Sequence, residues 1–224
     1  MKRRLKQNLW RAWLLAVCLG VGGLARAQDD ASRLSGGRLV EVGKGYSQTS
    51  VNTAIFRNSA LVTHKGVQYI SYYDAEGYLT LGKRKQGSGQ WTLHRTQYKG
   101  NVKDAHNVIS MMVDGEGYLH VAFDHHGQPL NYCRSVAPCS LELGEKEAMT
   151  GVDEENVTYP EFYRLSQGNL LFAYRSGASG QGNLVMNRYD TRTRTWSRVQ
   201  DVLLDGEGER NAYWQLYVDG QGTI

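Results

Sequence analysis

The chain has little proline, few cysteines and no long hydrophobic run. Only 3 of its 224 residues are Pro, against 26 Gly and 14 Tyr. Many glycines and aromatic residues with few prolines favour a sheet-rich fold with tight turns. The main apolar stretch, Leu14 to Leu24, is well short of the roughly 18–20 residues that a membrane-spanning helix needs. The sequence therefore argues against a transmembrane anchor.

Acidic residues are absent from residues 1–27, which hold six of the 26 Lys and Arg. The basic start, the short apolar run and the sequence Ala25-Arg26-Ala27 predict a secretory signal peptide over residues 1–27. The mature chain then has 20 basic and 22 acidic residues, a net charge of −2 (20 − 22). Because the basic pI belongs to the leader, we expect no nucleic-acid partner. We also expect a secreted or periplasmic monomer that has no membrane association after cleavage.

Two cysteines remain after cleavage, Cys133 and Cys139, in a C-x5-C spacing. In an oxidising compartment they could form a local disulfide. Two unpaired thiols, or a zinc site with His125 or His126, are the alternatives that the sequence leaves open.

A repeat of about 50 residues runs through the chain. Gly66, Gly117, Gly168 and Gly222 begin similar strands and are 51, 51 and 54 residues apart. In the first three repeats a small residue lies five positions after the glycine, and an aromatic residue follows it. Later strands, which begin at Leu79, Leu130 and Leu184, recur 51 and 54 residues apart.

Four short strands per repeat at this period predict an all-β fold, a β-propeller of four-stranded antiparallel blades. A β-sandwich or β-solenoid explains the fixed period less well. Only about three and a half blades are present, so we expect a fragment of a longer propeller. The expected parts are a signal peptide (1–27), a lead-in (28–49), blade 1 (50–98), blade 2 (99–150), blade 3 (151–206) and the start of blade 4 (207–224).

Two hairpins bring chemically useful side chains to their open ends. His106 and His126 are each ten residues from Glu116 in the turn, so they should face each other across the strands. Tyr159 and Arg175 are each eight residues from Gln167 and should meet in the same way. In neighbouring blades these four side chains would share one rim. Arg210 and Tyr213 of the fourth repeat could join them.

Four stretches resemble the BNR-repeat propeller family that includes the ulvan lyases. They are SVNTAIFRNSALVTHKG, DAHNVISMMVDGEGYLHVAFDHHGQPLNY, VTYPEFYRLSQGNLLFAYRSGASGQGN and RNAYWQLYVDGQGTI, and the resemblance covers about residues 44–224. It implies a seven-bladed propeller and a secreted lyase that cleaves uronic-acid polymers by β-elimination. It also implies that His106 and Tyr159 are the acid and base, and that His126 and Arg175 bind the substrate carboxylate.

The complete expected substrate-binding set is His126, Arg175, His125, Asn107, Arg210 and Tyr213. Arg175 suits a uronate carboxylate because a guanidinium binds it through two hydrogen bonds and stays charged. Whether His106 or Tyr159 is the base stays open. The mechanism requires no metal or other cofactor, although a structural calcium in the Asp-Gly turns is compatible with the sequence.

Two other functions compete with the lyase. A non-catalytic carbohydrate-binding propeller would use the same Tyr- and Arg-rich rim without turnover. A sialidase-type hydrolase would need the S-x-D-x-G-x-T-W motif, and the stretch from Asp219 to Thr223 lacks its Ser and Trp.

Overall fold

The computed structural model describes residues 39–224 except 46, 55–57 and 211–212. The predicted signal peptide therefore lies outside the described residues. The chain divides into two units, Met1–Glu41 and Val42–Ile224, and every described strand belongs to the second. Within the described residues, no helix is long and apolar enough to span a bilayer.

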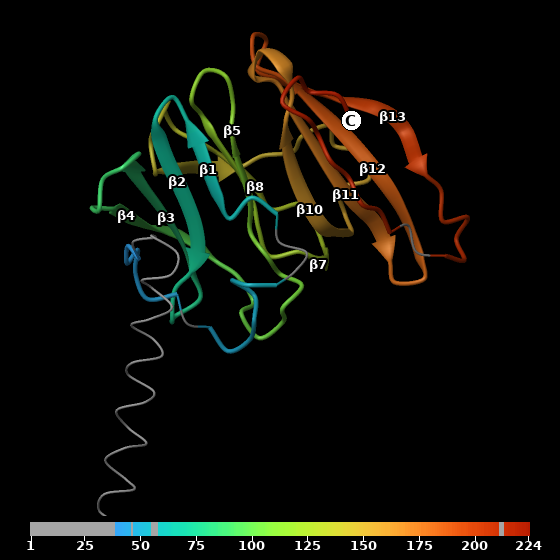
Figure 1. The fold of residues 1–224 in the computed structure, drawn as a ribbon. Helices are drawn as coiled ribbons and strands as arrows, with labels where there is room; N and C mark the ends of the chain where they lie inside the picture. The colour runs from blue at the N-terminus through green and yellow to red at the C-terminus, as the bar shows by residue number, and fades with distance from the viewer. Residues whose placement is uncertain (1–38, 46, 55–57, 211–212) are drawn as a thin grey trace, which may run out of the picture. The chain divides into compact units, whose positions relative to one another are not determined.

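Three antiparallel sheets form the second unit (Figure 1). The first has the order β1 (Leu61–His64), β2 (Val67–Tyr73), β3 (Tyr78–Lys85), β4 (Thr92–Lys99). The second has the order β5 (Ser110–Val113), β6 (Leu119–Ala122), β8 (Tyr132–Ser135), β9 (Leu143–Lys146). The third has the order β13 (Thr195–Leu204), β12 (Gln181–Asp190), β11 (Leu170–Ala178), β10 (Val157–Arg164), β7 (His126–Gln128).

The prediction of an all-β, antiparallel fold is confirmed. Among the described residues the only helical element is the short 3-10 turn η1 (Ser166–Gly168). One feature of the sheets was not predicted: β7 comes from the second repeat but pairs with β10 of the third sheet. This pairing carries His126 to the edge of the third sheet and so links the two predicted halves of the site.

Aspartates build the turns that recur along the chain. The Oδ1 atom of Asp114 accepts hydrogen bonds from the backbone N–H groups of Glu116, Gly117 and Tyr118 at 3.0, 2.8 and 2.9 Å. Asp74 and Asp219 make the same kind of turn in the first repeat and near the C-terminal end. Such side-chain-to-backbone bonds fix a tight turn between two strands.

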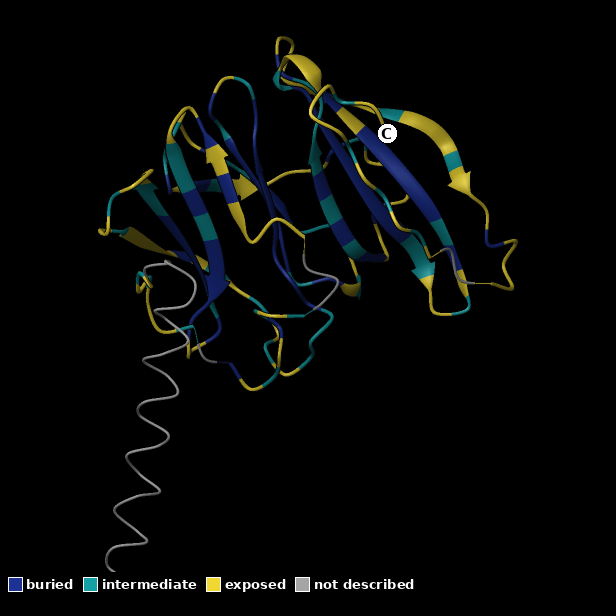
Figure 2. Ribbon diagram, in the orientation of Figure 1, coloured by how far each residue is buried: buried dark blue, intermediate teal, exposed yellow. Residues whose placement is uncertain are grey.

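The core runs through the inner strands of all three sheets. All four residues of β5 and of β6 are buried, as the dark blue segments of Figure 2 show. The second and third sheets also touch at their turns, where the N–H of Gly115 donates to the carbonyl of Gly168 over 2.9 Å. A Cβ on Gly168 would lie 2.2 Å from the Cα of Gly115, so no side chain fits there.

The registers of the two site hairpins differ from each other. Ser110 pairs with Ala122, which agrees with the predicted register, but the ladder ends at this pair, and His126 lies in β7, which pairs with β10 instead. In the other hairpin Arg175 pairs with Thr158, and the register shifts between Thr158 and Glu161. The predicted pairing of Tyr159 with Arg175 is therefore wrong by one residue. Tyr159 has a φ of 56° and precedes Pro160, which has no N–H for the strand ladder.

The cysteines form no disulfide. Cys133 is buried in the core and Cys139 is partly exposed, and both are free thiols. Of the three states that the sequence leaves open, the structure has the two unpaired thiols. Cys133 lies in strand β8 and its side chain is buried in the packed core, whereas Cys139 lies in a turn beside Gly117.

Candidate active site

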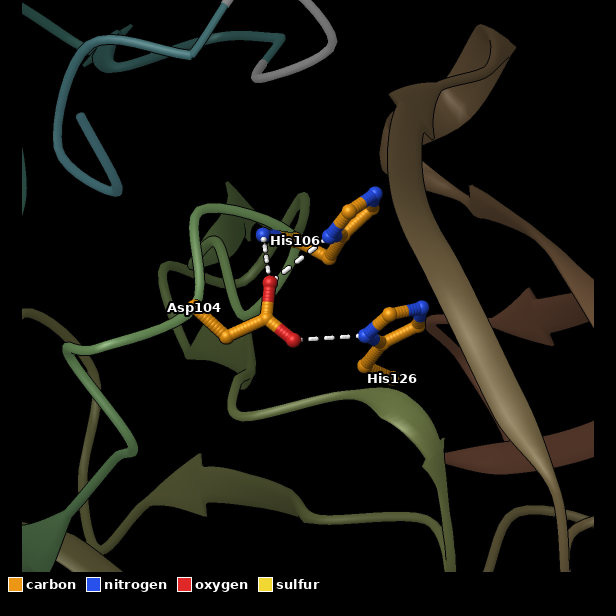
Figure 3. Close-up of side chains that lie close together, drawn as sticks. All are labelled: Asp104, His106 and His126. Carbon is orange, nitrogen blue, oxygen red and sulfur yellow. Dashed lines mark hydrogen bonds and ion pairs between the residues drawn. The ribbon is translucent and has the colours of Figure 1, made fainter. Parts of the chain in front are cut away.

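One carboxylate joins the two histidines of the first hairpin. Nδ1 of His106 lies 2.6 Å from Oδ1 of Asp104, and Nδ1 of His126 lies 2.6 Å from Oδ2 (Figure 3). The imidazole rings stack, with centroids 4.1 Å apart and planes at 19°. The predicted meeting of His106 and His126 is therefore present in the structure. Figure 3 also shows that the far nitrogens of both rings point to the same side, away from Asp104.

Tyr159 connects this pair to Arg175. Its ring centroid is 6.0 Å from that of His106, and the guanidinium carbon of Arg175 lies 5.0 Å from it on the ring face. Arg175 is only 2% exposed. Gly182 makes room for its stem, because a Cβ there would lie 2.5 Å from Cδ of Arg175. The bulge at Tyr159 thus places the phenol over the guanidinium instead of directly across the ladder from it.

Aromatic side chains continue the site beyond Tyr159. The rings of Tyr213 and Trp214 have centroids 6.1 and 6.5 Å from that of Tyr159. Together with Glu161 these three residues line a cavity of about 190 Å³. Glu161 accepts a hydrogen bond from Nε1 of Trp214 at 2.9 Å and fixes that ring. Flat aromatic faces beside charged groups are suited to a sugar ring.

The surroundings shift two pKa values in useful directions. Burial raises the pKa of Tyr159, and the charge of Arg175 offsets this only in part. Burial alone would also raise the pKa of Asp104. Hydrogen bonds from the His106 backbone and from both imidazoles outweigh that effect and hold the pKa of Asp104 well below its usual range. At neutral pH the phenol is therefore protonated and the carboxylate is charged.

Three of the expected binding residues are either buried or already paired within the protein. His125 is fully buried, and its Nε2 accepts a hydrogen bond from the backbone N–H of Asn131 at 2.8 Å. Asn107 is also buried, and its carbonyl accepts from the hydroxyl of Tyr73 at 3.0 Å. Arg210 is exposed and its guanidinium pairs with Glu207 at 2.5 Å. The structure therefore gives no direct support to substrate contacts by His125, Asn107 or Arg210.

Sequence reasoning missed Asp104, Glu161 and Trp214 as parts of the site. For Asp104 a signal was present, since an aspartate two residues before a histidine commonly closes a turn on the following backbone N–H. That bond exists here, from the His106 N–H to Oδ1 of Asp104 at 2.9 Å. Glu161 and Trp214 come together from two repeats through tertiary packing, which gives no local signal.

Asp104, His106 and His126 are also the described residues that could hold a metal ion, with ligand atoms within 4.8 Å of one another. Both Nδ1 atoms and both carboxylate oxygens already take part in hydrogen bonds of 2.6 Å. An ion bound through these atoms would have to replace those bonds.

Sequence comparison places the chain among known proteins. A family model described as BNR repeat-containing family member matches residues 67–224. The long isoform of ulvan lyase from Pseudoalteromonas sp. (strain PLSV) is 28% identical over 210 residues, which cover 70% of this chain and 21% of that enzyme. The short isoform from Alteromonas sp. (strain LOR) is 38% identical over 176 residues, covering 57% of this chain and 33% of that enzyme. The chain thus spans a fifth to a third of these relatives.

Solved structures show the same fold. A PL25 ulvan lyase matches with a TM-score of 0.58 at 20% identity, over 71% of this chain and 41% of that enzyme. The polysaccharide lyase Uly1 matches with a TM-score of 0.57 at 17% identity, over 72% of this chain and 44% of that enzyme. The PL25 enzyme has also been solved bound to a GlcA(1-4)Rha3S unit, with the same TM-score of 0.58.

Proposed function

The chain belongs to the BNR repeat-containing family that includes the ulvan lyases, and we propose that it is part of a secreted polysaccharide lyase. Its substrate would be an acidic, ulvan-like polymer that contains a uronic acid, cleaved by β-elimination. The observation that carries this proposal is the convergence of His106, His126, Tyr159 and Arg175. An imidazole, a phenol and a guanidinium supply the base, the acid and the positive charge that the reaction needs.

The reaction begins at C5 of the uronic acid. The proton there is weakly acidic while the neighbouring carboxylate is charged, so a cation on the carboxylate stabilises the enolate-like transition state. Arg175 would supply this charge, because a guanidinium remains protonated at any working pH. The burial that surrounds Arg175 strengthens its electrostatic effect.

His106 and Tyr159 would then divide the two proton transfers between them. His106 takes the C5 proton, the released electron pair forms the C4–C5 double bond, and the bond from C4 to the glycosidic oxygen breaks. Tyr159 protonates that departing oxygen. The raised pKa of Tyr159 favours the phenol as the acid, since a phenolate would be needed for it to act as the base.

Tyr213 and Trp214 would form a stacking surface for a sugar ring next to the reacting residue. Tyr213 is 61% exposed, so a ligand can reach its ring. His126 would contribute beside His106. We further propose that the three sheets are successive blades of a propeller of about seven blades, which acts as a monomer outside the cytoplasm.

The burial of Arg175 favours a second candidate function. A guanidinium that is 2% exposed and covered by Tyr159 has limited access to a carboxylate. The same rim could then bind an acidic polysaccharide through Tyr213 and Trp214 without cleaving it. This reading predicts binding without turnover.

Turnover distinguishes the two functions. The protein is incubated with ulvan and with other uronic-acid polymers, and the ultraviolet absorbance of the unsaturated product is followed. The proposal expects a rise in absorbance that Tyr159→Phe abolishes, since phenylalanine keeps the ring but removes the proton. The matched control is Tyr217→Phe, because Tyr217 is an exposed tyrosine near the C-terminal end. Retardation by ulvan on a gel without any absorbance change would support the binding protein instead.

A further inference from the structure

We propose that Asp104 is a positioning residue that holds both His106 and His126 with the proton on Nδ1, so that both Nε2 atoms face the substrate side as acceptors. This inference rests on the proposed lyase function and assigns a task to a residue outside the predicted set. It begins from the bridge of two 2.6 Å hydrogen bonds between one carboxylate and two imidazoles.

The direction of these hydrogen bonds follows from the charge on Asp104. An ionised carboxylate has no proton, so it can only accept. The two imidazoles must therefore both donate from Nδ1. Oδ1 receives two bonds, from Nδ1 and from the backbone N–H of His106, whereas Oδ2 receives one bond, from His126. The lowered pKa of Asp104 agrees with a carboxylate that is ionised at neutral pH.

The loop that carries Asp104 is held by several further bonds. The backbone N–H of Asp104 donates to the carbonyl of Asn101, and that of Asn107 donates to the carbonyl of Asp104. The side-chain amide of Asn107, which is buried, donates to the carbonyl of Asn101 over 3.2 Å. Asn107 thus acts as a support of the loop. A carboxylate on a braced loop can dictate the orientation of both rings.

The consequence concerns the far nitrogens. A neutral imidazole that carries its proton on Nδ1 has none on Nε2, and Figure 3 shows Nε2 of both rings on the side away from Asp104. His106 can then accept a proton at Nε2, and the imidazolium that forms still faces the carboxylate. Neutral His126 presents an acceptor in the same way. It therefore cannot donate to the uronate carboxylate, and Arg175 is left to neutralise that charge.

The Asp104→Asn variant should affect the two histidines differently. The amide oxygen can keep both bonds to His106, so the amide NH₂ takes the place of Oδ2 and faces Nδ1 of His126. We expect His126 alone to move its proton to Nε2. The turnover number kcat should fall by about 10²-fold, because the imidazolium of His106 loses its counter-charge, whereas KM should change by less than about threefold.

Long-range proton–nitrogen NMR spectra of the histidine rings read the tautomers without any need for activity. In the unmodified protein both rings should carry the proton on Nδ1, and in Asp104→Asn only His106 should. An Nε2-protonated ring in the unmodified protein overturns the inference, as does an Asn variant with unchanged tautomers and full kcat. If the variant does not fold, the spectrum of the unmodified protein alone decides.

Asp124→Asn is the matched control. Asp124 is on the neighbouring loop and accepts a bond from the backbone N–H of Asn101 at 2.6 Å, a role that an asparagine oxygen can keep. This variant should retain both tautomers and full turnover. A protein that shows the expected tautomers but cleaves no uronic-acid polymer would refute the lyase function and leave the tautomer assignment standing. An active enzyme with an Nε2-protonated ring would refute the role of Asp104 alone.

Discussion

Within Asp104–His126 the chain places two pairs of histidines in opposite surroundings. His120 and His125 have no exposed surface, whereas the side chains of His106 and His126 are each 39% exposed. Each environment also includes an aspartate bonded to a histidine, Asp114 inside and Asp104 at the mouth. The comparison shows that an Asp–His contact by itself does not identify a reactive site. What distinguishes the two environments is where the second nitrogen of the imidazole ring points.

In the interior pair, His120 is committed on both sides. Its Nδ1 lies 2.7 Å from the hydroxyl of Tyr132 and its Nε2 lies 3.3 Å from Oδ2 of Asp114. Burial lowers the pKa of His120, although Asp114 opposes this shift. At the mouth, the carboxylate of Asp104 engages Nδ1 of each ring, and the other nitrogen of each ring points away from Asp104. The interior network holds strands together, whereas the mouth network would exchange protons in the proposed lyase reaction.

The largest expected effect belongs to the mouth. His106→Ala should lower kcat on the best uronic-acid polymer by about 10²–10⁴-fold, because the proposed general base is removed. The free energy of unfolding should change by less than about 1 kcal/mol, since the ring is partly exposed. Initial rates and urea unfolding measure the two quantities. Full activity in this variant would remove His106 from the mechanism.

The interior pair should show the reverse. His120→Ala leaves Oδ2 of Asp114 and the hydroxyl of Tyr132 without their imidazole partner and opens a cavity, which should cost about 3 kcal/mol of stability. Urea unfolding at neutral pH is the measurement, and kcat of the folded fraction should stay near that of the unmodified protein. His94→Ala is the control, because His94 is exposed on β4 and should change stability by less than about 0.5 kcal/mol. Equal losses of stability in His120→Ala and His94→Ala would contradict the structural role of His120.

His125 makes the comparison dependent on pH. Burial lowers the pKa of His125 to about 3, compared with 6.5 in an unfolded chain. Between these values the unfolded chain binds a proton that the folded protein does not bind. The stabilising contribution is therefore complete above about pH 6.5 and is lost as pH falls toward 3, at up to about 1.4 kcal/mol per pH unit.

His125→Gln tests this slope, because glutamine keeps an acceptor for the N–H of Asn131 and has no titrating group. The free energy of unfolding, measured by urea at several pH values from 4 to 7, should depend less steeply on pH in the variant. Parallel curves for the two proteins would show that His125 is not buried in its neutral form.

Much of this arrangement was readable from the sequence. The equal distances from Glu116 predicted that His106 and His126 meet, and their rings do stack, although the β5–β6 ladder itself ends at Ser110 and Ala122. Strand alternation could also have separated His125 from His126, since adjacent residues in extended chain point to opposite sides. Here one is buried and the other is exposed.

Other parts could not be predicted in this way. The Thr158–Pro160 bulge breaks the extrapolation that worked in the first hairpin, because a residue with positive φ before a proline adds one position to the strand. The pairing of β7 with β10 crosses from one repeat to the next. A repeat period reports which strands are alike. It does not report such contacts between repeats.

The smallest expected effect concerns the two aspartates and is the most direct test of the comparison. Asp104→Asn should change the free energy of unfolding by less than about 1 kcal/mol, because its side chain is 30% exposed and solvent screens its interactions. Asp114→Asn should cost more, about 1–2 kcal/mol, because Asp114 is fully buried against His120 and its new amide would face Nε2 of that ring. Both variants keep an oxygen for the backbone bonds of their turns, so the difference isolates the second carboxylate oxygen. Paired urea titrations at pH 7 give the difference. A larger loss in Asp104→Asn would mean that the mouth network holds the fold together, and its two histidines would then be structural as well.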